Sequence, residues 1–225
     1  MNYISHYFID GINGLPYYNL GLILPDLAGI FDRHLKLLDV STEVEMTKTN
    51  HELYSGIMKH YQLDSIFHQS NYFVTYTGKI KHYFTITDFQ HQPNRQHFLA
   101  HFLLELAIDM VIINREEGIL DHFYAEFDKV EKQPFINFFN YTDTEKINGF
   151  YLFVDKFRAK RYLYNFVSAD AVVFVIQKIQ ERIGLKVIDN QIEIDKLKKC
   201  IEMIASDISS EFDMIKKIRD EYISY

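Results

Sequence analysis

The pattern of apolar positions is helical almost throughout the chain, with apolar residues recurring every three or four positions. The clearest stripe lies near the end of the chain and consists of Ile194, Leu197, Ile201, Ile204, Ile208, Phe212, Ile215, Ile218 and Tyr222. This spacing predicts one long amphipathic C-terminal helix with a single apolar face. Packing across a helical bundle is the simplest interpretation, and the seam of a homodimer is the alternative.

Six further segments show helical periodicity. They are 51–68, 72–84, 93–113, 118–130, 144–164 and 169–182. The segment 72–84 is rich in aromatic and β-branched residues, but a helix is favoured because one short strand would have no partner. Ser168 is the expected N-cap of the last of these helices, and Gly184 is expected to end it. The polar stretch 41–50 is expected to be a connection.

Length and composition fit one all-α domain. The chain has 225 residues, of which 48% are hydrophobic, and this is enough to bury a sizeable core. We therefore expect a single-domain multi-helix bundle over 1–225. Its core is expected over 1–188 and the long C-terminal helix over 189–225.

Charge and cysteine content exclude several classes of function. The net charge of −7 argues against binding to nucleic acid and to anionic membrane surfaces. The single cysteine, Cys200, excludes a disulfide framework and a multi-cysteine metal site within the chain. The first residues lack the features of a signal peptide, and no charge-free apolar run reaches about 18 residues. We therefore expect a cytoplasmic protein without a membrane span.

The ten histidines raise the question of metal binding, and their spacing from carboxylates narrows it. His60, Asp64 and His68 follow one another at four-residue intervals, so a helix places them on one face. Their nitrogen and oxygen donors suit Zn²⁺, Mn²⁺ or Fe²⁺. The three residues can hold one ion or straddle two, with Asp64 as the bridge.

A second set of residues at four-residue intervals consists of His101, Glu105 and Asp109 and lies in a strongly apolar segment. We call each such set a ladder. Carboxylates in such a helix are costly to bury unless they are paired, hydrogen-bonded or metal-bound. Two helices that each carry such a ladder would supply most of a two-metal site inside a bundle. The alternative is a structural network in which these polar side chains only specify packing.

Three more candidate ligands precede the first ladder, namely His6, Asp26 and His34. His6 lies in an apolar run, where a core histidine is the alternative. Asp26 follows Pro25, where a helix cap is the alternative. His34 would share a face with Asp26 if one helix continued through both. The remaining histidines are expected at the surface or outside the ligand set: His51, His82, His91, His97 and His122.

Part of this pattern resembles a known family. The resemblance is carried by the segments 1–6 and 19–26 and by Gly56, His60, Asp64 and Phe67. In these features the chain resembles bacterial acyl carrier protein phosphodiesterases, which are helical, metal-dependent and related to the HD phosphohydrolases. The resemblance implies hydrolysis of the phosphodiester that joins phosphopantetheine to a serine of acyl carrier protein. The chain has Tyr61 where that family usually has Arg, and His68 where it usually has Asp.

These departures point to a second resemblance, to zinc-dependent phospholipase C and the related single-strand nucleases. It is carried by Pro25, Asp26, Gly56, His60, Asp64, Phe67, His68, His101 and Glu105. Those enzymes are also all-helical and hold a cluster of zinc ions. The resemblance implies zinc ligation by His60 and Asp64, with Asp26 and His34 joining them. It implies a second site made of the following residues: His68, His101 and Glu105.

Together these features predict a metal-dependent phosphodiesterase. A bound divalent metal, with zinc first and manganese or iron as alternatives, would activate a water molecule. Asp64 is the expected bridge, and Asp109 the expected orienting group or general base. Four basic residues are candidates for holding a phosphodiester substrate or the acidic surface of acyl carrier protein: Lys156, Arg158, Lys160 and Arg161. A solvated helix face is the alternative for this basic cluster, and a non-catalytic metal-binding or helical interaction protein is the alternative function.

Overall fold

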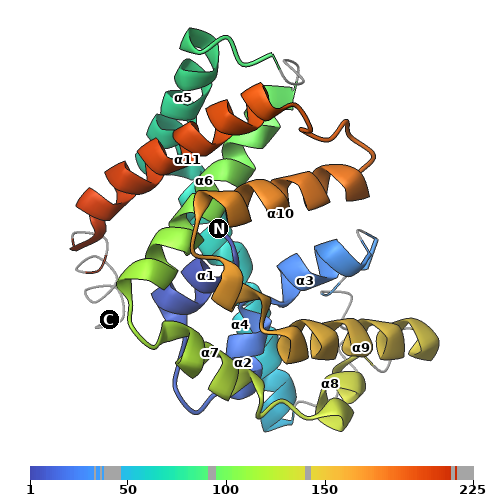
Figure 1. Cartoon of the computed structure of the whole chain (residues 1–225). Coiled ribbons are helices and arrows are strands. Elements are labelled where there is room, and N and C mark those ends of the chain that lie inside the picture. The colour runs from blue at the N-terminus through green and yellow to red at the C-terminus, as the bar shows by residue number, and fades with distance from the viewer. Residues whose placement is uncertain are drawn as a thin grey trace. The chain divides into compact units, whose positions relative to one another are not determined.

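The chain is helical over the residues that the structure describes. The computed structural model describes residues 1–32, 34, 35, 37, 47–90, 95–139, 143–213 and 216. The helices are α1 (Tyr3–Asp10), α2 (Pro16–Gly21), α3 (Leu24–Phe31), α4 (Lys48–Gln69), α5 (Asn71–Ile86), α6 (Gln96–Arg115), α7 (Ile119–Phe127), α8 (Lys132–Phe138), α9 (Thr144–Lys160), the 3-10 helix η2 (Tyr162–Asn165), α10 (Ala169–Arg182) and α11 (Gln191–Ser210). These ranges contain no strand, which confirms the predicted all-α fold (Figure 1).

Most of the helices predicted from periodicity are confirmed. The aromatic segment 72–84 lies inside α5 and forms no strand. Ser168 is the N-cap of α10, because its Oγ accepts a hydrogen bond from the backbone N–H of Ala171. Gly184 follows the end of α10 with a φ of +70°, which favours glycine and stops the helix.

The structure differs from the predicted helices in several places. The predicted helix 144–164 is divided, because α9 ends at Lys160 and the 3-10 helix η2 follows. The helix α8 was not predicted, and its seven residues are too few to display a clear period. The helix α4 begins at Lys48, inside the expected connection 41–50, of which 41–46 lie outside the described residues.

The chain divides into two compact units, each built from two separate segments. The first unit consists of Met1–Ser65 and Gly118–Tyr164, and the second consists of Ile66–Glu117 and Asn165–Tyr225. The first contains α1, α2, α3, α7, α8, α9 and most of α4, whereas the second contains α5, α6, α10, α11 and the last turn of α4. The single-domain organisation expected from the sequence stays a prediction.

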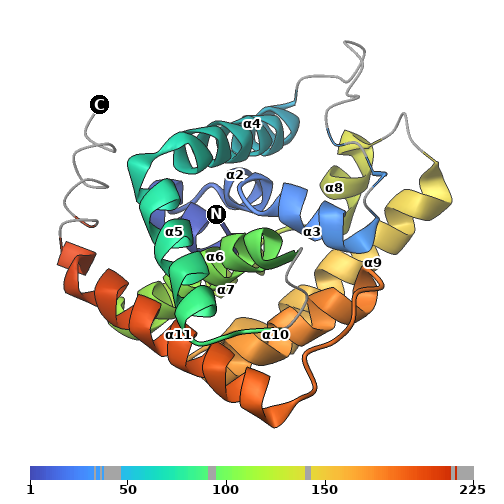
Figure 2. The same cartoon turned by 90° about the horizontal axis from the view of Figure 1, so that it is seen from above.

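In the second unit, α6 packs against three other helices. Its neighbours are α5, α10 and α11, and α11 also lies along α5 and α10 (Figures 1 and 2). The buried residues of α11 are Leu197, Cys200, Ile201, Ile204 and Ile208. Four of them belong to the apolar stripe seen in the sequence, so this part of the predicted amphipathic helix packs with its apolar face inside the fold. The stripe residues Ile215, Ile218 and Tyr222 lie outside the described residues.

Among the described helices, α6 is long and apolar enough to cross a membrane by length and composition. Of its most apolar 18-residue window, 61% is buried. A core helix of a soluble protein has the same properties, and α6 also carries the buried carboxylates Glu105 and Asp109. The predicted absence of a membrane span stays a prediction.

In the first unit, aromatic side chains anchor α3. Phe31, at the end of α3, lies with its ring centroid 5.3 Å from that of Phe150 on α9. Phe150 is fully buried and also contacts Phe135 on α8, with ring centroids 5.6 Å apart. Burying such large rings contributes strongly to the core. This packing fixes the helix that carries Asp26.

In the same unit, α2 and α4 approach each other so closely that only glycine fits at their crossing. A Cβ atom on Gly21 would lie 2.5 Å from the carbonyl oxygen of Leu53 and 2.8 Å from the Cα of Gly56. A Cβ atom on Gly56 would lie 2.1 Å from the carbonyl oxygen of Tyr18. The two helices therefore touch through their backbones, which requires the absence of a side chain at both positions.

We expect Gly56→Ala to destabilise the protein, because its new methyl group would force α2 and α4 apart. Overpacking of this kind costs roughly 1–3 kcal/mol in the free energy of unfolding. The matched control is Gly78→Ala on α5, where a Cβ atom meets nothing within 4 Å. That change should instead stabilise its helix by about 0.5–1 kcal/mol. Urea denaturation measures both, and equal effects of the two substitutions would contradict the proposed packing.

Candidate functional site

Four potential metal ligands gather in the first unit. This first cluster consists of His6 on α1, Asp26 on α3, and His60 and Asp64 on α4. One donor atom from each of His6, Asp26 and His60 lies within 4.8 Å of the other two. His6 and His60 are buried, and their rings stack with centroids 4.0 Å apart. Three helices therefore bring nitrogen and oxygen donors to one point.

The imidazole of His60 is oriented by the backbone. Its Nδ1 lies 2.8 Å from the carbonyl oxygen of Leu22, and since a carbonyl only accepts, Nδ1 carries the proton. The close crossing of α2 and α4 makes this bond, because Leu22 directly follows Gly21. The other nitrogen, Nε2, faces Asp64 Oδ2 at 3.5 Å and Asp26 Oδ1 at 3.9 Å. Metal-bound histidines are commonly oriented by such a bond from their second ring nitrogen.

The charge state of His60 follows from its burial. Desolvation, together with the neighbouring His6, lowers the pKa of His60 to about 4, so its ring is neutral near pH 7. A neutral ring with its proton on Nδ1 presents a lone pair on Nε2. That nitrogen lies beside the carboxylates of Asp64 and Asp26. The arrangement favours a cation between them.

The carboxylate of Asp64 contacts both histidines of the cluster and the amino terminus. Its Oδ1 lies 3.2 Å from His6 Nε2 and 2.7 Å from the amino nitrogen of Met1. Burial raises the pKa of the Asp64 carboxyl, but the contacts with His6 and the amino group outweigh burial and hold this pKa well below its usual range. Asp64 is therefore ionised at neutral pH.

A second cluster lies in the second unit and consists of His68, His101 and Glu105. The Nε2 atoms of both histidines lie 2.9 Å from the same carboxylate oxygen, Glu105 Oε1. Burial raises the pKa of Glu105, but hydrogen bonds from His101 and His68 outweigh it and lower the pKa to about 2. Glu105 is therefore a buried, charged carboxylate at neutral pH.

The predicted ladder on α4 contributes residues to both clusters. His60 and Asp64 belong to the first cluster, whereas His68 belongs to the second. The sequence spacing correctly placed all three on one helix. It could not show that their partners come from different segments, because those partners are set by tertiary packing.

Two of the predicted metal-binding and catalytic residues lie outside both clusters. The helix α3 ends at Phe31, so the condition for Asp26 and His34 to share a helix face is not met, and the prediction of His34 as a ligand beside Asp26 is wrong. His34 instead lies exposed in a turn, where its backbone N–H donates to Asp32 Oδ1. Asp109 is fully buried within α6 and belongs to neither group of potential ligands.

Tyr61 was not predicted as a site residue, although it directly follows His60. Its ring stands edge-on to that of His60, with centroids 5.5 Å apart. Burial, together with Asp26 and Asp64, raises the pKa of its phenol, so the hydroxyl keeps its proton. The sequence offered one sign of a role for Tyr61. It stands directly after His60, at a position where acyl carrier protein phosphodiesterases usually have Arg.

The four basic residues predicted to hold substrate divide into two pairs. Arg158 donates from Nη1 to the carbonyl oxygens of Val130 at 2.9 Å and Phe127 at 3.3 Å, so it satisfies carbonyls at and beyond the end of α7. Arg161 pairs with Asp128. Both arginines therefore pair with groups of the protein itself rather than standing free for a substrate. The other two, Lys156 and Lys160, are exposed.

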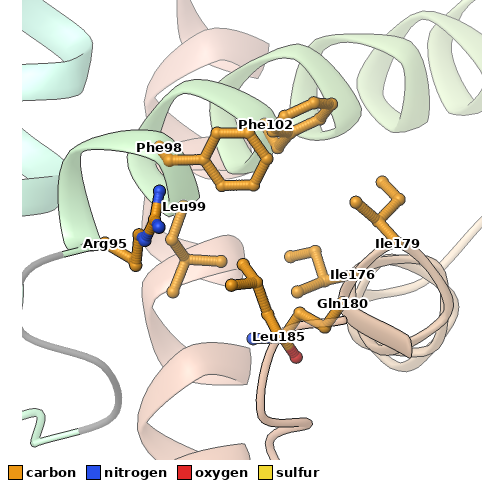
Figure 3. A pocket seen from close by; sticks show the side chains of 8 residues that line it. All are labelled: Arg95, Phe98, Leu99, Phe102, Ile176, Ile179, Gln180 and Leu185. Carbon is orange, nitrogen blue, oxygen red and sulfur yellow. The ribbon is translucent and has the colours of Figure 1, made fainter. Parts of the chain in front are cut away.

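A shallow apolar pocket lies in the second unit, between α6 and the end of α10 (Figure 3). Its lining consists of Arg95, Phe98, Leu99, Phe102, Ile176, Ile179, Gln180 and Leu185. The amide oxygen of Gln180 accepts a hydrogen bond from the backbone N–H of Ile188, so this side chain supports the segment after α10. The pocket contains no histidine or carboxylate and does not share the chemistry of the two clusters.

Comparisons with protein-family models, with curated proteins and with solved structures gave no significant match.

We expect Arg158→Ala to lower the free energy of unfolding by about 1.5–3 kcal/mol, the range for hydrogen bonds that involve a charged group. The substitution leaves the carbonyl oxygens of Val130 and Phe127 without this donor. Lys156→Ala is the matched control on the same helix, since Lys156 is exposed and should change stability by less than about 0.5 kcal/mol. Denaturant unfolding compares the two, and a neutral Arg158→Ala would contradict the structural role.

Proposed function

We propose that the first cluster holds a divalent metal ion, with zinc first and manganese or iron as alternatives, and that the protein hydrolyses phosphodiesters. The orientation of His60 carries this proposal. Its Nδ1–H donates to the Leu22 carbonyl, and its Nε2 therefore turns toward Asp26 and Asp64. A lone pair held beside two negative groups is stabilised by nearby positive charge. The Met1 amino group supplies part of that charge at Asp64 Oδ1, and a divalent cation held by His60, Asp26 and Asp64 would supply it at all three donors.

The donors of the first cluster fit this type of ion. Two imidazoles and two carboxylates are the common ligands of zinc in sites without cysteine, and manganese and iron accept the same mixture. The hydrogen bond to Leu22 is the outer contact that usually accompanies a ligating histidine. The types of ligand, the tautomer of His60 and its hydrogen bond to Leu22 are therefore all consistent with a metal site.

The chemistry follows from this arrangement. When bound, a divalent ion lowers the pKa of water and neutralises charge that develops on phosphate oxygens. The buried His6 and His60 would hold the ion together with Asp64, whose two carboxylate oxygens face their Nε2 atoms. Tyr61 keeps its phenolic proton and is 40% exposed, so it can donate a hydrogen bond to an anionic substrate. This mechanism does not use the fully buried Asp109.

The substrate we favour is acyl carrier protein carrying phosphopantetheine. The resemblance of the segments around His6, Asp26 and His60 to acyl carrier protein phosphodiesterases supports this choice. Lys156 and Lys160 give α9 an exposed basic pair that can meet the acidic surface of a carrier protein. A phospholipid is the alternative phosphodiester, given the second resemblance.

We expect the purified protein to hydrolyse bis-p-nitrophenyl phosphate, to lose this activity with a chelator and to recover it with zinc or manganese. His60→Ala should lower kcat/KM by at least ~100-fold, because it removes a ligand on which the metal chemistry depends. His51→Ala is the matched control, since His51 is an exposed histidine on the same helix. Absorbance of the released nitrophenolate measures the activity of all three proteins, with and without chelator and added metal.

Two outcomes would contradict this proposal. One is activity that persists in the chelated protein, and the other is equal loss of activity in His60→Ala and His51→Ala. Absence of turnover together with tightly bound metal would instead identify a metal-binding protein that does not catalyse this reaction. Elemental analysis of the same preparations separates these cases.

For the carrier-protein substrate, we expect the double variant Lys156→Glu, Lys160→Glu to raise KM for holo acyl carrier protein by about tenfold or more. The reason is that like charges would then face each other across the complex. Turnover of bis-p-nitrophenyl phosphate should stay unchanged, because this small diester needs no docking surface. Release of phosphopantetheine measures the reaction. Hydrolysis of phosphatidylcholine vesicles without hydrolysis of the carrier protein would refute this choice of substrate.

A further inference from the structure

The geometry points to a metal site made by His68, His101 and Glu105 that binds its own divalent ion and leaves a coordination position open to an anion. All three residues belong to the second unit, so the site is complete without any residue of the first cluster. The inference goes beyond the phosphodiesterase proposal and does not rest on it.

The distances within this cluster are close to those of a metal site. Each histidine Nε2 lies 2.9 Å from Glu105 Oε1. Ligand atoms around one zinc ion are roughly 3–3.5 Å apart, because each metal–ligand bond is about 2.0–2.2 Å long. Small side-chain rotations, with each ring proton moved from Nε2 to Nδ1, would therefore convert the observed arrangement into a coordination sphere.

The rings of the two histidines are held in place by aromatic neighbours. Phe73 stands edge-on to both, with its ring centroid 5.0 Å from that of His68 and 5.0 Å from that of His101. Phe67 lies against His68 and Phe102 against His101. These contacts restrict ring rotation, so the ligands are preorganised before an ion arrives.

Burial and charge favour an ion at this point. The Glu105 side chain is only 10% exposed and lies on an apolar helix, where an ionised carboxylate needs a nearby positive charge. Glu105 contributes the one carboxylate among the three ligands. A divalent cation bound by all three donor atoms would therefore leave a net positive charge. The resulting positive charge would attract an anion.

An ion in this cluster would be reachable from solvent. The His68 and His101 side chains are 32% and 34% exposed, in contrast to the buried Glu105. Three protein ligands from imidazole and carboxylate groups are the set found in open zinc sites, in which an external ligand occupies the remaining position. Phosphate and carboxylate groups are the class of anion that this position fits.

The test uses the full chain carrying His60→Ala, which removes a ligand of the first cluster. Chelator-treated protein is titrated with Co²⁺, and the visible absorption of the bound ion is recorded. We expect one ion per chain in this background. Adding His68→Ala or His101→Gln should weaken binding by more than about tenfold, since each removes one of three protein ligands. Inorganic phosphate should then change the absorption spectrum of the single variant.

The matched control adds His97→Ala to the same background. His97 is an exposed histidine on α6, one turn before His101 and outside the cluster, so this change should leave Co²⁺ binding unaltered. Circular dichroism checks that each variant is folded, and His68 and His101 are exposed enough for their replacement to be tolerated. This readout needs no turnover, so it is independent of the phosphodiesterase proposal.

Three results would overturn the inference. The first is no Co²⁺ binding in the folded His60→Ala protein. The second is equal binding with and without His68 and His101. The third is a spectrum that phosphate leaves unchanged, which would mean that the bound ion has no position open to this class of ligand.

Discussion

The backbone contact between α2 and α4 is the constraint on which the first cluster depends. Gly21 and Gly56 allow the two helices to touch, and this contact brings the Leu22 carbonyl to the ring of His60. The carbonyl then decides which ring nitrogen carries the proton, and so which one faces Asp64. A packing requirement at two glycines thus determines the chemistry of a histidine one helical turn away.

Burial gives the two clusters different characters. In the first, His60 is almost fully enclosed and stays neutral, so its carboxylate partners face a lone pair. In the second, Glu105 is the enclosed residue, and its two histidines reach the surface. The same types of side chain therefore produce a site with buried nitrogen donors in one unit and a site with a buried oxygen donor in the other.

Much of the fold could be predicted from the sequence, because period and capping are local properties. The apolar stripe of α11 and the cap at Ser168 are examples. The ladder spacing also identified His60, Asp64 and His68 as neighbours on one helix. What could not be predicted was the Leu22 carbonyl that orients His60, because a backbone carbonyl leaves no trace in a side-chain pattern. His34 was misplaced for a related reason, since only the structure shows where α3 ends.

The division of the chain into interleaved segments has a consequence for its synthesis. The first unit combines Met1–Ser65 with Gly118–Tyr164, so a ribosome must complete about half of the second unit before the first can close. Domains generally fold as units while they emerge. Here the ligands of each cluster emerge early, from His6 to Glu105, before α9 and α11 are available to pack. During that interval the apolar faces that these helices later cover are exposed to the cell.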